Sequence, residues 1–193
     1  NRNWDSIEEL WKIKEWVKAE QGEVAKAFQR PTAADVLRAL EATDAGRAFL
    51  ADKIVPYQKV FGFKSMWAHE FAFRTWRENP APIVEAIRGY LEADYDYPAE
   101  LKAVADDLEA AKAEALEGVA GPARDELQRA LDLSLRMNPL TPDHHFYIDQ
   151  GTNARVRLVL VATGRALARE GRLDDPEDVM YLRYNELRRL MAG

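Results

Sequence analysis

The sequence contains no cysteine, so it offers no thiol nucleophile, no disulfide and no thiolate metal ligand. It has no run approaching the roughly 20 apolar residues needed to span a bilayer. Its first residues, NRNWDSIEEL, lack the basic start and apolar centre of a signal peptide. These absences predict a cytoplasmic protein that does not interact with membranes.

Recognisable catalytic motifs are also missing. There is no GxxxxGK phosphate loop, and Gly164 stands alone within a helical pattern, which argues against nucleotide binding by this chain. Neither a GxSxG nucleophile elbow nor an HExxH zinc motif occurs. We therefore predict no catalytic residue in the chain itself.

The charge balance is acidic, with 27 Lys and Arg against 33 Asp and Glu and a formal net charge of -6. A nucleic-acid surface needs clustered basic side chains that displace counterions from phosphates, so the balance argues against a nucleic-acid partner. With 47% hydrophobic and 31% charged residues, the 193-residue chain has the composition of a globular domain.

Apolar residues recur at three- and four-residue spacing almost throughout, and period-two alternation is scarce. The pattern predicts an all-α fold, an irregular multi-helix bundle forming a single helical domain over residues 1–193. Ser6 and Glu9 form a capping-box pattern for a first helix that should run to about Gln29 and stop before Pro31.

Two later segments predict a long antiparallel helical hairpin. One helix is expected from Ala99 to Val119, and the next carries leucines at four-residue steps from Leu127 to Leu135. A further helix should run from Thr141 to about Glu170, with Gly171 as its left-handed cap. Residues 179–182 suggest a short strand-like stub.

Residues 61–77 are irregular and rich in aromatic side chains, which predicts a loop or a broken helix. Aromatic rings mixed with a few polar groups are typical of a pocket for a flat organic molecule, although the same residues are also able to form a core under a long loop. The candidates for acceptor binding here are Lys64, Trp67, His69 and Arg74.

The three histidines are the natural candidates for proton transfer or ligand binding. His144 and His145 are adjacent and point about 100° apart on a helix, whereas His145 and Asp149 are four residues apart and share a face. The second pair offers half of a metal site that His69 might complete in three dimensions. The alternative is polar residues that hydrogen-bond near a helix start, and on balance we predict no metal site.

Several segments together resemble the helical middle region of the phosphoenolpyruvate synthase-like phosphotransferases, the family that includes rifampicin phosphotransferase. They are Phe61-Gly62, Trp76 to Pro80, His145 to Asp149, and DDPEDVMYL with the following Glu186-Leu187. The resemblance extends over residues 61–187, and the first sixty residues are compatible in helical pattern only. After the glycine this chain has Phe63 and Lys64, where relatives often have His and Arg.

The resemblance implies a substrate-binding segment of an ATP-dependent phosphotransferase, with an ATP-grasp domain and a swivelling phosphohistidine domain elsewhere in the same enzyme. The Ser-His carrier motif is absent here, and the chain begins at Asn1, so we expect a fragment of a larger multidomain enzyme. ATP and Mg are implied for the full enzyme, with no cofactor bound by this segment.

The implied partner is a small-molecule acceptor, and the aromatic residues favour a ring-bearing one. Its expected contacts are Lys64, Trp67, His69, Arg74, His144, His145, Tyr147 and Asp149. The alternative function is a non-enzymatic helical module that binds a ligand or docks a protein, in which case the hairpin should carry an exposed apolar stripe.

Overall fold

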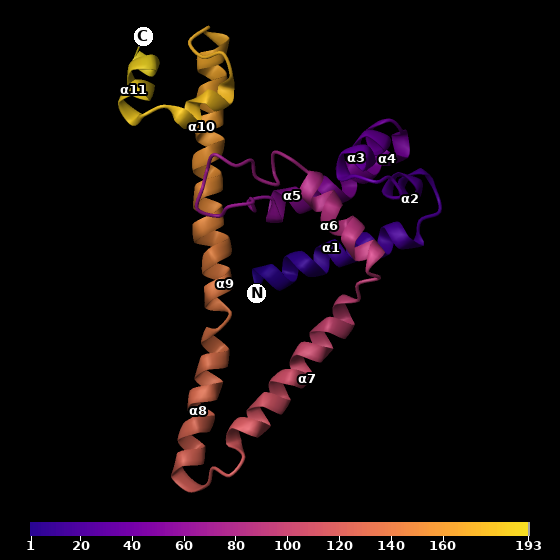
Figure 1. Cartoon of the computed structure of the whole chain (residues 1–193), viewed down its shortest axis with the longest axis vertical. Coiled ribbons are helices and arrows are strands. Elements are labelled where there is room, and N and C mark those ends of the chain that lie inside the picture. The colour runs from indigo at the N-terminus through magenta and orange to yellow at the C-terminus, as the bar shows by residue number, and fades with distance from the viewer. Residues whose placement is uncertain (193) are drawn as a thin grey trace. The chain divides into compact units, whose positions relative to one another are not determined.

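The computed structural model describes residues 1–192, and within that range it contains helices and loops but no strand, which confirms the all-α prediction (Figure 1). The elements in chain order are α1 (Arg2–Ala19), α2 (Glu23–Phe28), α3 (Ala33–Glu41), α4 (Asp44–Phe49), the π-helix η1 (Leu50–Ile54), α5 (Val55–Phe61), α6 (Ala81–Glu92), α7 (Tyr97–Leu116), α8 (Gly121–Met137), α9 (Leu140–His144), the π-helix η2 (His145–Gln150), α10 (Gly151–Arg169), the 3-10 helix η3 (Pro176–Tyr181) and α11 (Tyr184–Ala192). Among the described residues, no helix has the length and apolar character needed to cross a membrane.

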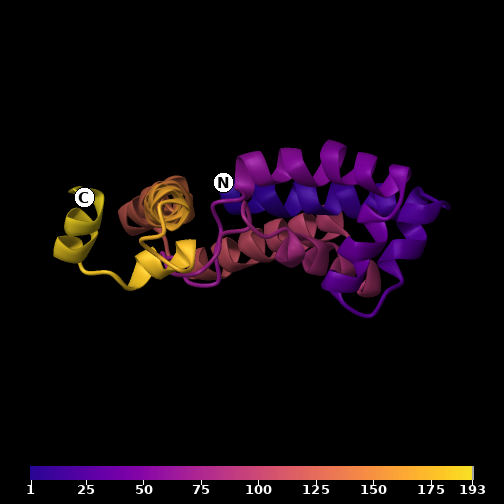
Figure 2. The same cartoon turned by 90° about the horizontal axis from the view of Figure 1, so that it is seen from above.

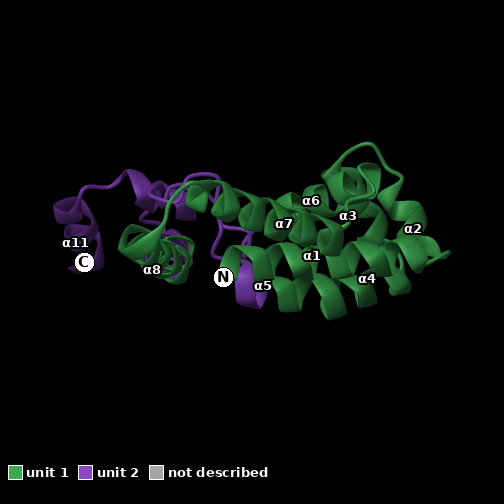
Figure 3. Cartoon of the chain, turned by 90° about the horizontal axis from the view of Figure 1, so that it is seen from below, with its two compact units in different colours: residues 1–57, 80–144 green, residues 58–79, 145–193 purple. Residues whose placement is uncertain are grey.

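The chain divides into two compact units (Figure 3). Unit 1 consists of Asn1–Tyr57 and Pro80–His144, and unit 2 of Gln58–Asn79 and His145–Gly193. One boundary falls inside α5 and another between α9 and η2, so each unit draws on two separate stretches of sequence. Whether the whole chain folds as one domain stays a prediction.

Unit 1 is built around α6, against which both α1 and α3 pack (Figure 2). Ile83, Val84 and Ile87 of α6 are fully buried, as the spacing of its apolar residues predicts. On α1, which packs against α6, Leu10 and Val17 are also buried. Burial of each such side chain stabilises the fold by about 1.5–3 kcal/mol.

The first helix begins and ends earlier than predicted. The capping box expected at Ser6 and Glu9 is wrong, because the side chain of Asn1 caps the helix by accepting from the amide of Asn3, and Ser6 is buried within it. α1 ends at Ala19 because Glu20 and Gly22 both have extended backbone, and the chain becomes helical again only at Glu23. The expected stop before Pro31 is confirmed, since α2 ends at Phe28.

The two helices of the predicted hairpin, α7 and α8, are joined by a turn in which Gly118 and Gly121 have φ of 69° and 61°. Nη1 of Arg124 donates to the carbonyl oxygens of Leu116 and Val119, 2.7 and 3.3 Å away, and so fixes the turn. These contacts lie beside the turn. Antiparallel packing along the whole length of the two helices stays a prediction.

Unit 2 is organised by α10, whose buried Val161, Gly164 and Leu167 form the side that packs against η3. The strand-like stub expected at residues 179–182 is wrong, because a capping box between Asp175 and Asp178 starts a 3-10 helix that runs to Tyr181. At the end of α10, Gly171 has φ of 72°, as its predicted role as a left-handed cap requires.

Candidate functional site

Residues 62–79 of unit 2 form a closed loop, which confirms the prediction for this irregular stretch. The amide of Trp76 donates to the carbonyl of Lys64, and the amide of Arg77 to that of Gly62, each at 2.8 Å. Glycine is required at position 62, since a Cβ there would lie 2.2 Å from the carbonyl oxygen of Gln58. The base of the loop is therefore fixed by its own backbone.

Arg157 of α10 holds the rest of the loop, and its side chain is completely buried. Nε donates to both carboxylate oxygens of Glu78, at 3.0 and 2.8 Å. Nη1 donates to the carbonyl oxygens of Phe71 and Ala72, at 3.1 and 2.8 Å, and Nη2 to Glu177 at 3.1 Å. One guanidinium thus joins the loop, α10 and η3, and every contact is charge-assisted.

These contacts set the protonation of the acidic partners. Burial acts to raise the pKa of Glu78, but hydrogen bonds from Arg157 and Thr75, with the charge of Arg157, outweigh it and lower the pKa below the usual range. The pKa of Glu177 is likewise lowered, because hydrogen bonds from Arg74 and Arg157 outweigh the effect of burial. Both carboxylates stay ionised and keep the network intact.

Arg74, a predicted acceptor contact, makes an ion pair with Glu177, and its role in acceptor binding stays a prediction. Its Nη2 lies 2.6 Å and its Nε 2.8 Å from Oε1 of Glu177. The Arg74 side chain remains 64% exposed.

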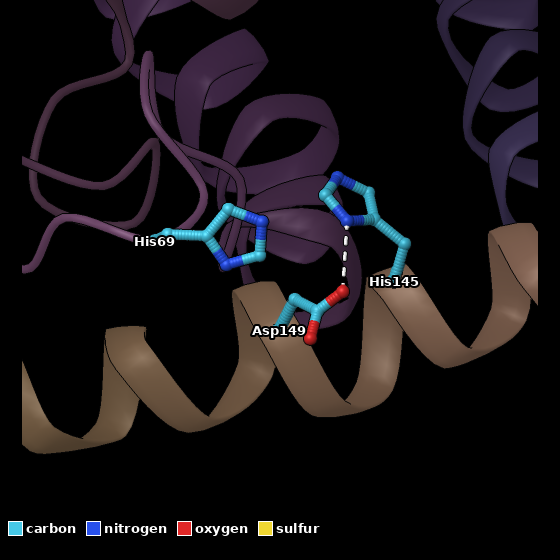
Figure 4. Close-up of side chains that lie close together, drawn as sticks. All are labelled: His69, His145 and Asp149. Atoms are coloured by element: carbon cyan, nitrogen blue, oxygen red, sulfur yellow. Dashed lines mark hydrogen bonds and ion pairs between the residues drawn. The ribbon is translucent and has the colours of Figure 1, made fainter.

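Three of the predicted residues come together where the loop meets η2 (Figure 4). Nδ1 of His145 lies 3.1 Å from Oδ2 of Asp149, so the predicted pairing on one helix face is confirmed. The ring of His69 lies 6.1 Å from that of His145, centroid to centroid. One ligand atom from each of the three residues lies within 4.8 Å of the other two.

The position of His69 is set by its neighbour in sequence. Nδ2 of Asn153 donates to the carbonyl of Ala68 at 2.8 Å and to that of Asp149 at 2.9 Å. This amide therefore ties the loop to the turn of η2 that carries Asp149. Such π-helical segments are uncommon and often occur at functional sites.

The residues of η2 divide into an anchor and an exposed side. Phe146 is buried against Phe61 with ring centroids 6.1 Å apart. Tyr147, another predicted contact, is 52% exposed, and its neighbour Ile148 is exposed to a similar extent. His144 belongs to unit 1, and the group formed by His69, His145 and Asp149 does not include it.

The aromatic residues of the loop differ in exposure, and a ligand pocket formed by them stays a prediction. Phe61 is buried and forms core, whereas Trp67 is 60% exposed and Phe71 and Phe73 are about two-fifths exposed. The tip of the loop therefore presents aromatic surface to solvent, where a ligand can reach it.

Lys64 lies at the base of this loop with its Nζ 5.3 Å from the ring centroid of Trp76. Burial lowers the pKa of Lys64 to about 8. The adjacent ring of Phe63 is flanked by the guanidinium groups of Arg155 and Arg77, 4.6 and 5.6 Å from its centroid. Cations and aromatic rings thus alternate along the base of the loop.

Sequence reasoning did not identify Arg157, Glu78 and Glu177 as a group. One signal was present, because Arg157 falls at helical spacing among small and apolar residues that prove to be buried, Ala154 and Val161. A charged residue at such a position requires buried partners. The sequence alone does not say that these partners lie in distant segments.

Comparison with known proteins gives three findings. A family model described as the rifampicin phosphotransferase fourth domain matches residues 3–140, a range that includes the loop and ends before η2. An uncharacterized phosphotransferase, YvkC of Bacillus subtilis (strain 168), is 32% identical over 149 residues, 77% of this chain and 18% of that protein. Chondramide synthase cmdD of Chondromyces crocatus is 27% identical over 194 residues, 98% of this chain and 5% of that protein.

The chain thus spans less than a fifth of the length of either relative. No solved structure matches it.

Proposed function

The chain belongs to the rifampicin phosphotransferase fourth-domain family, and from this premise we propose that it is the helical acceptor-binding segment of an ATP-dependent phosphotransferase. The ATP and phosphohistidine chemistry, with its Mg²⁺, takes place on other domains of the same enzyme, which are of the ATP-grasp and swivelling phosphohistidine types. This segment contributes the surface that holds the small molecule to be phosphorylated.

The observation that carries this proposal is the convergence of the loop and η2 in unit 2. Exposed Trp67 offers a face on which a flat ring can stack, and imidazole and carboxylate groups of His69, His145 and Asp149 lie where the loop meets the helix. Exposed aromatic rings and a few polar groups carried by the same loop suit a ring-bearing acceptor with a hydroxyl group.

Binding measurements on single variants test the proposal. The probes are rifampicin, the compound in the name of the matched family, and pyruvate as a small molecule without a ring, each titrated against the chain by calorimetry. Trp67→Ala and His145→Ala should each weaken binding of the ring-bearing probe about fivefold, because a stacked aromatic contact and a hydrogen bond each contribute about 1 kcal/mol.

The matched control is Tyr181→Ala, which removes an aromatic side chain of η3 that is 82% exposed. This variant should bind the probe as the unchanged chain does. If Trp67→Ala and His145→Ala also bind normally, the acceptor surface lies elsewhere and the proposal fails.

The rest of the enzyme is tested at the level of the gene. The coding DNA on both sides of this segment should encode an ATP-grasp region and a Ser-His carrier loop, in the same reading frame or in the next gene. Their absence would leave the segment without a phosphoryl donor and would favour the second candidate.

That second candidate is a helical module that docks a protein through α7. Leu101, Val104 and Leu108 recur at helical spacing and are 43%, 43% and 39% exposed. Such a stripe on a helix favours a protein partner. Replacing Val104 with Asp should abolish capture of a partner without affecting the binding of small molecules, and the two candidate functions therefore give different results.

A further inference from the structure

We propose that His69, His145 and Asp149 form a binding site for one divalent transition-metal ion of the Zn²⁺ class. The three side chains come from the loop and from η2, both in unit 2, and each offers one ligand atom within 4.8 Å of the others. The proposal concerns binding of the ion itself and does not depend on the identity of the acceptor.

The shortest separation in the group suits two ligands of one ion. Metal to ligand distances in zinc sites are about 2.1 Å for imidazole nitrogen and carboxylate oxygen. Nδ1 of His145 and Oδ2 of Asp149 are 3.1 Å apart. For an ion placed about 2.1 Å from each of them, the angle between the two metal–ligand bonds would be roughly 95°. That angle lies within the range of tetrahedral to octahedral coordination.

His69 has to move only slightly to complete the site. Ligand atoms of a tetrahedral ion are about 3.4 Å apart, so the widest separation of 4.8 Å must close by at most roughly 1.4 Å. His69 is exposed on the loop, and a change of side-chain torsion accommodates such a shift. The main chain beside it stays fixed, because Asn153 holds the carbonyl of Ala68.

The hydrogen bond between His145 and Asp149 explains that pair by itself, since a proton on Nδ1 joins the two groups. It gives no reason for a second imidazole beside them. His69 reaches this position from a part of the sequence far from η2, its ring inclined at 63° to that of His145. The group has the composition of a two-histidine, one-carboxylate site, and our sequence-based expectation of no metal is replaced by this proposal.

The donor set determines the class of ion. Imidazole nitrogen suits Zn²⁺, Co²⁺, Ni²⁺ and Fe²⁺, whereas Mg²⁺ prefers an all-oxygen, near-octahedral environment. Three protein ligands also leave the fourth position of a tetrahedral ion to water or to an oxygen atom of a bound molecule. The site therefore has the form of an open metal centre.

Metal binding by the 193-residue chain, with no acceptor present, tests the proposal directly. Zn²⁺ affinity is measured by competition with a chromogenic chelator, and Co²⁺ is added separately to record its visible absorption bands. One equivalent of ion should bind, and a hundredfold excess of Mg²⁺ should not displace it. His69→Ala, His145→Ala and Asp149→Asn should each lower Zn²⁺ affinity by at least about 100-fold, because even the loss of an outer-shell partner costs about 10- to 100-fold.

The matched control is His144→Ala, which removes the neighbouring histidine that stands outside the group. It should leave Zn²⁺ affinity and the Co²⁺ spectrum unchanged. Circular dichroism verifies that each variant is folded, and Asp149→Asn, which keeps the size of the side chain, gives a second reading if either histidine variant unfolds.

Three outcomes would overturn the proposal. They are failure of the unchanged chain to bind Zn²⁺, an equal loss of affinity in His144→Ala, and full affinity in any of the three ligand variants that is folded. All three are measured as Zn²⁺ affinity without an acceptor, whereas the proposed function is tested by binding of the small-molecule probes. Failure of the metal site can therefore be told apart from failure of the proposed function.

Discussion

Nε of Arg157 lies 3.0 and 2.8 Å from the two carboxylate oxygens of Glu78, and the arginine side chain is wholly buried. The pair joins α10 to the end of the loop, and Glu177 of η3 adds a second carboxylate, whose charge Arg74 balances. A buried ion pair of this kind contributes little net stability compared with an apolar pair, but removal of one partner is costly.

Replacing Arg157 with Met should therefore destabilise unit 2 by about 3–5 kcal/mol, because two carboxylates and two carbonyl oxygens each lose one charged donor. Urea unfolding at pH 7 measures the effect. The matched control is Arg165→Met, an exposed position on the same helix, which should change the free energy of unfolding by no more than about 0.5 kcal/mol. If both variants changed the free energy of unfolding equally, the buried network would contribute no more to stability than an exposed arginine.

The same network predicts loss of stability in acid. The pKa values of Glu78 and Glu177 are lowered in the folded chain, so the unfolded chain takes up protons first as the pH falls. Their contribution is complete above the unfolded-state pKa of about 4.3 and is lost as the pH falls through the folded pKa. Glu78→Gln should show a shallower decline in unfolding free energy below pH 4.3 than the unchanged chain. Parallel curves for the two proteins would contradict the prediction.

Lys64 should titrate near pH 8, because burial lowers its pKa to about 8. The test is to label the lysine amino groups with ¹³C-methyl and to follow the methyl NMR signal of Lys64, which is identified by its absence in Lys64→Arg. Its chemical shift should change with pH with a midpoint near pH 8. Lys112 provides the internal comparison, since its hydrogen bond to Glu109 raises its pKa above the usual value. A midpoint above pH 10 for Lys64 would mean that its ammonium group is well hydrated.

Gly164→Ala should destabilise the chain even though alanine is the better helix former. A Cβ at this position would lie 2.0 Å from the carbonyl oxygen of Pro176, so α10 and η3 would have to separate. Gly89 of α6 is the matched control, because a Cβ there meets nothing within 4 Å. Gly89→Ala should raise the free energy of unfolding by about 0.5–1 kcal/mol, and thermal unfolding of both variants should show opposite shifts.

Local chemistry accounts for what the sequence predicted well. The end of helix before Pro31, the cap at Gly171 and the pairing of His145 with Asp149 each depend on residues that are near one another in sequence. The same reasoning failed at Glu20 to Gly22, where a short extended stretch interrupts an apolar pattern that continues on both sides. Apolar spacing predicts which face is buried and is insensitive to such a break.

The candidate site was only partly predictable because most of it depends on long-range contacts. The aromatic and polar composition of the loop pointed to a site, and its expected roles in acceptor binding stay predictions. The joining of Glu78 to Arg157, and of Ala68 to Asn153, follows from the path of the chain through unit 2. No spacing rule within one helix or loop describes such a contact.

Because each unit draws on two separate stretches of sequence, unit 2 cannot finish folding until its second stretch has been synthesised. A ribosome releases residues 58–79 before it has begun α10, so this part of unit 2 emerges with the carbonyl groups of Phe71 and Ala72 still bound to water. Its base is held by its own backbone hydrogen bonds, but the rest of the loop is fixed only when Arg157 has been made. Chains that terminate before α10 would therefore display helices of unit 1 but no assembled network around Arg157.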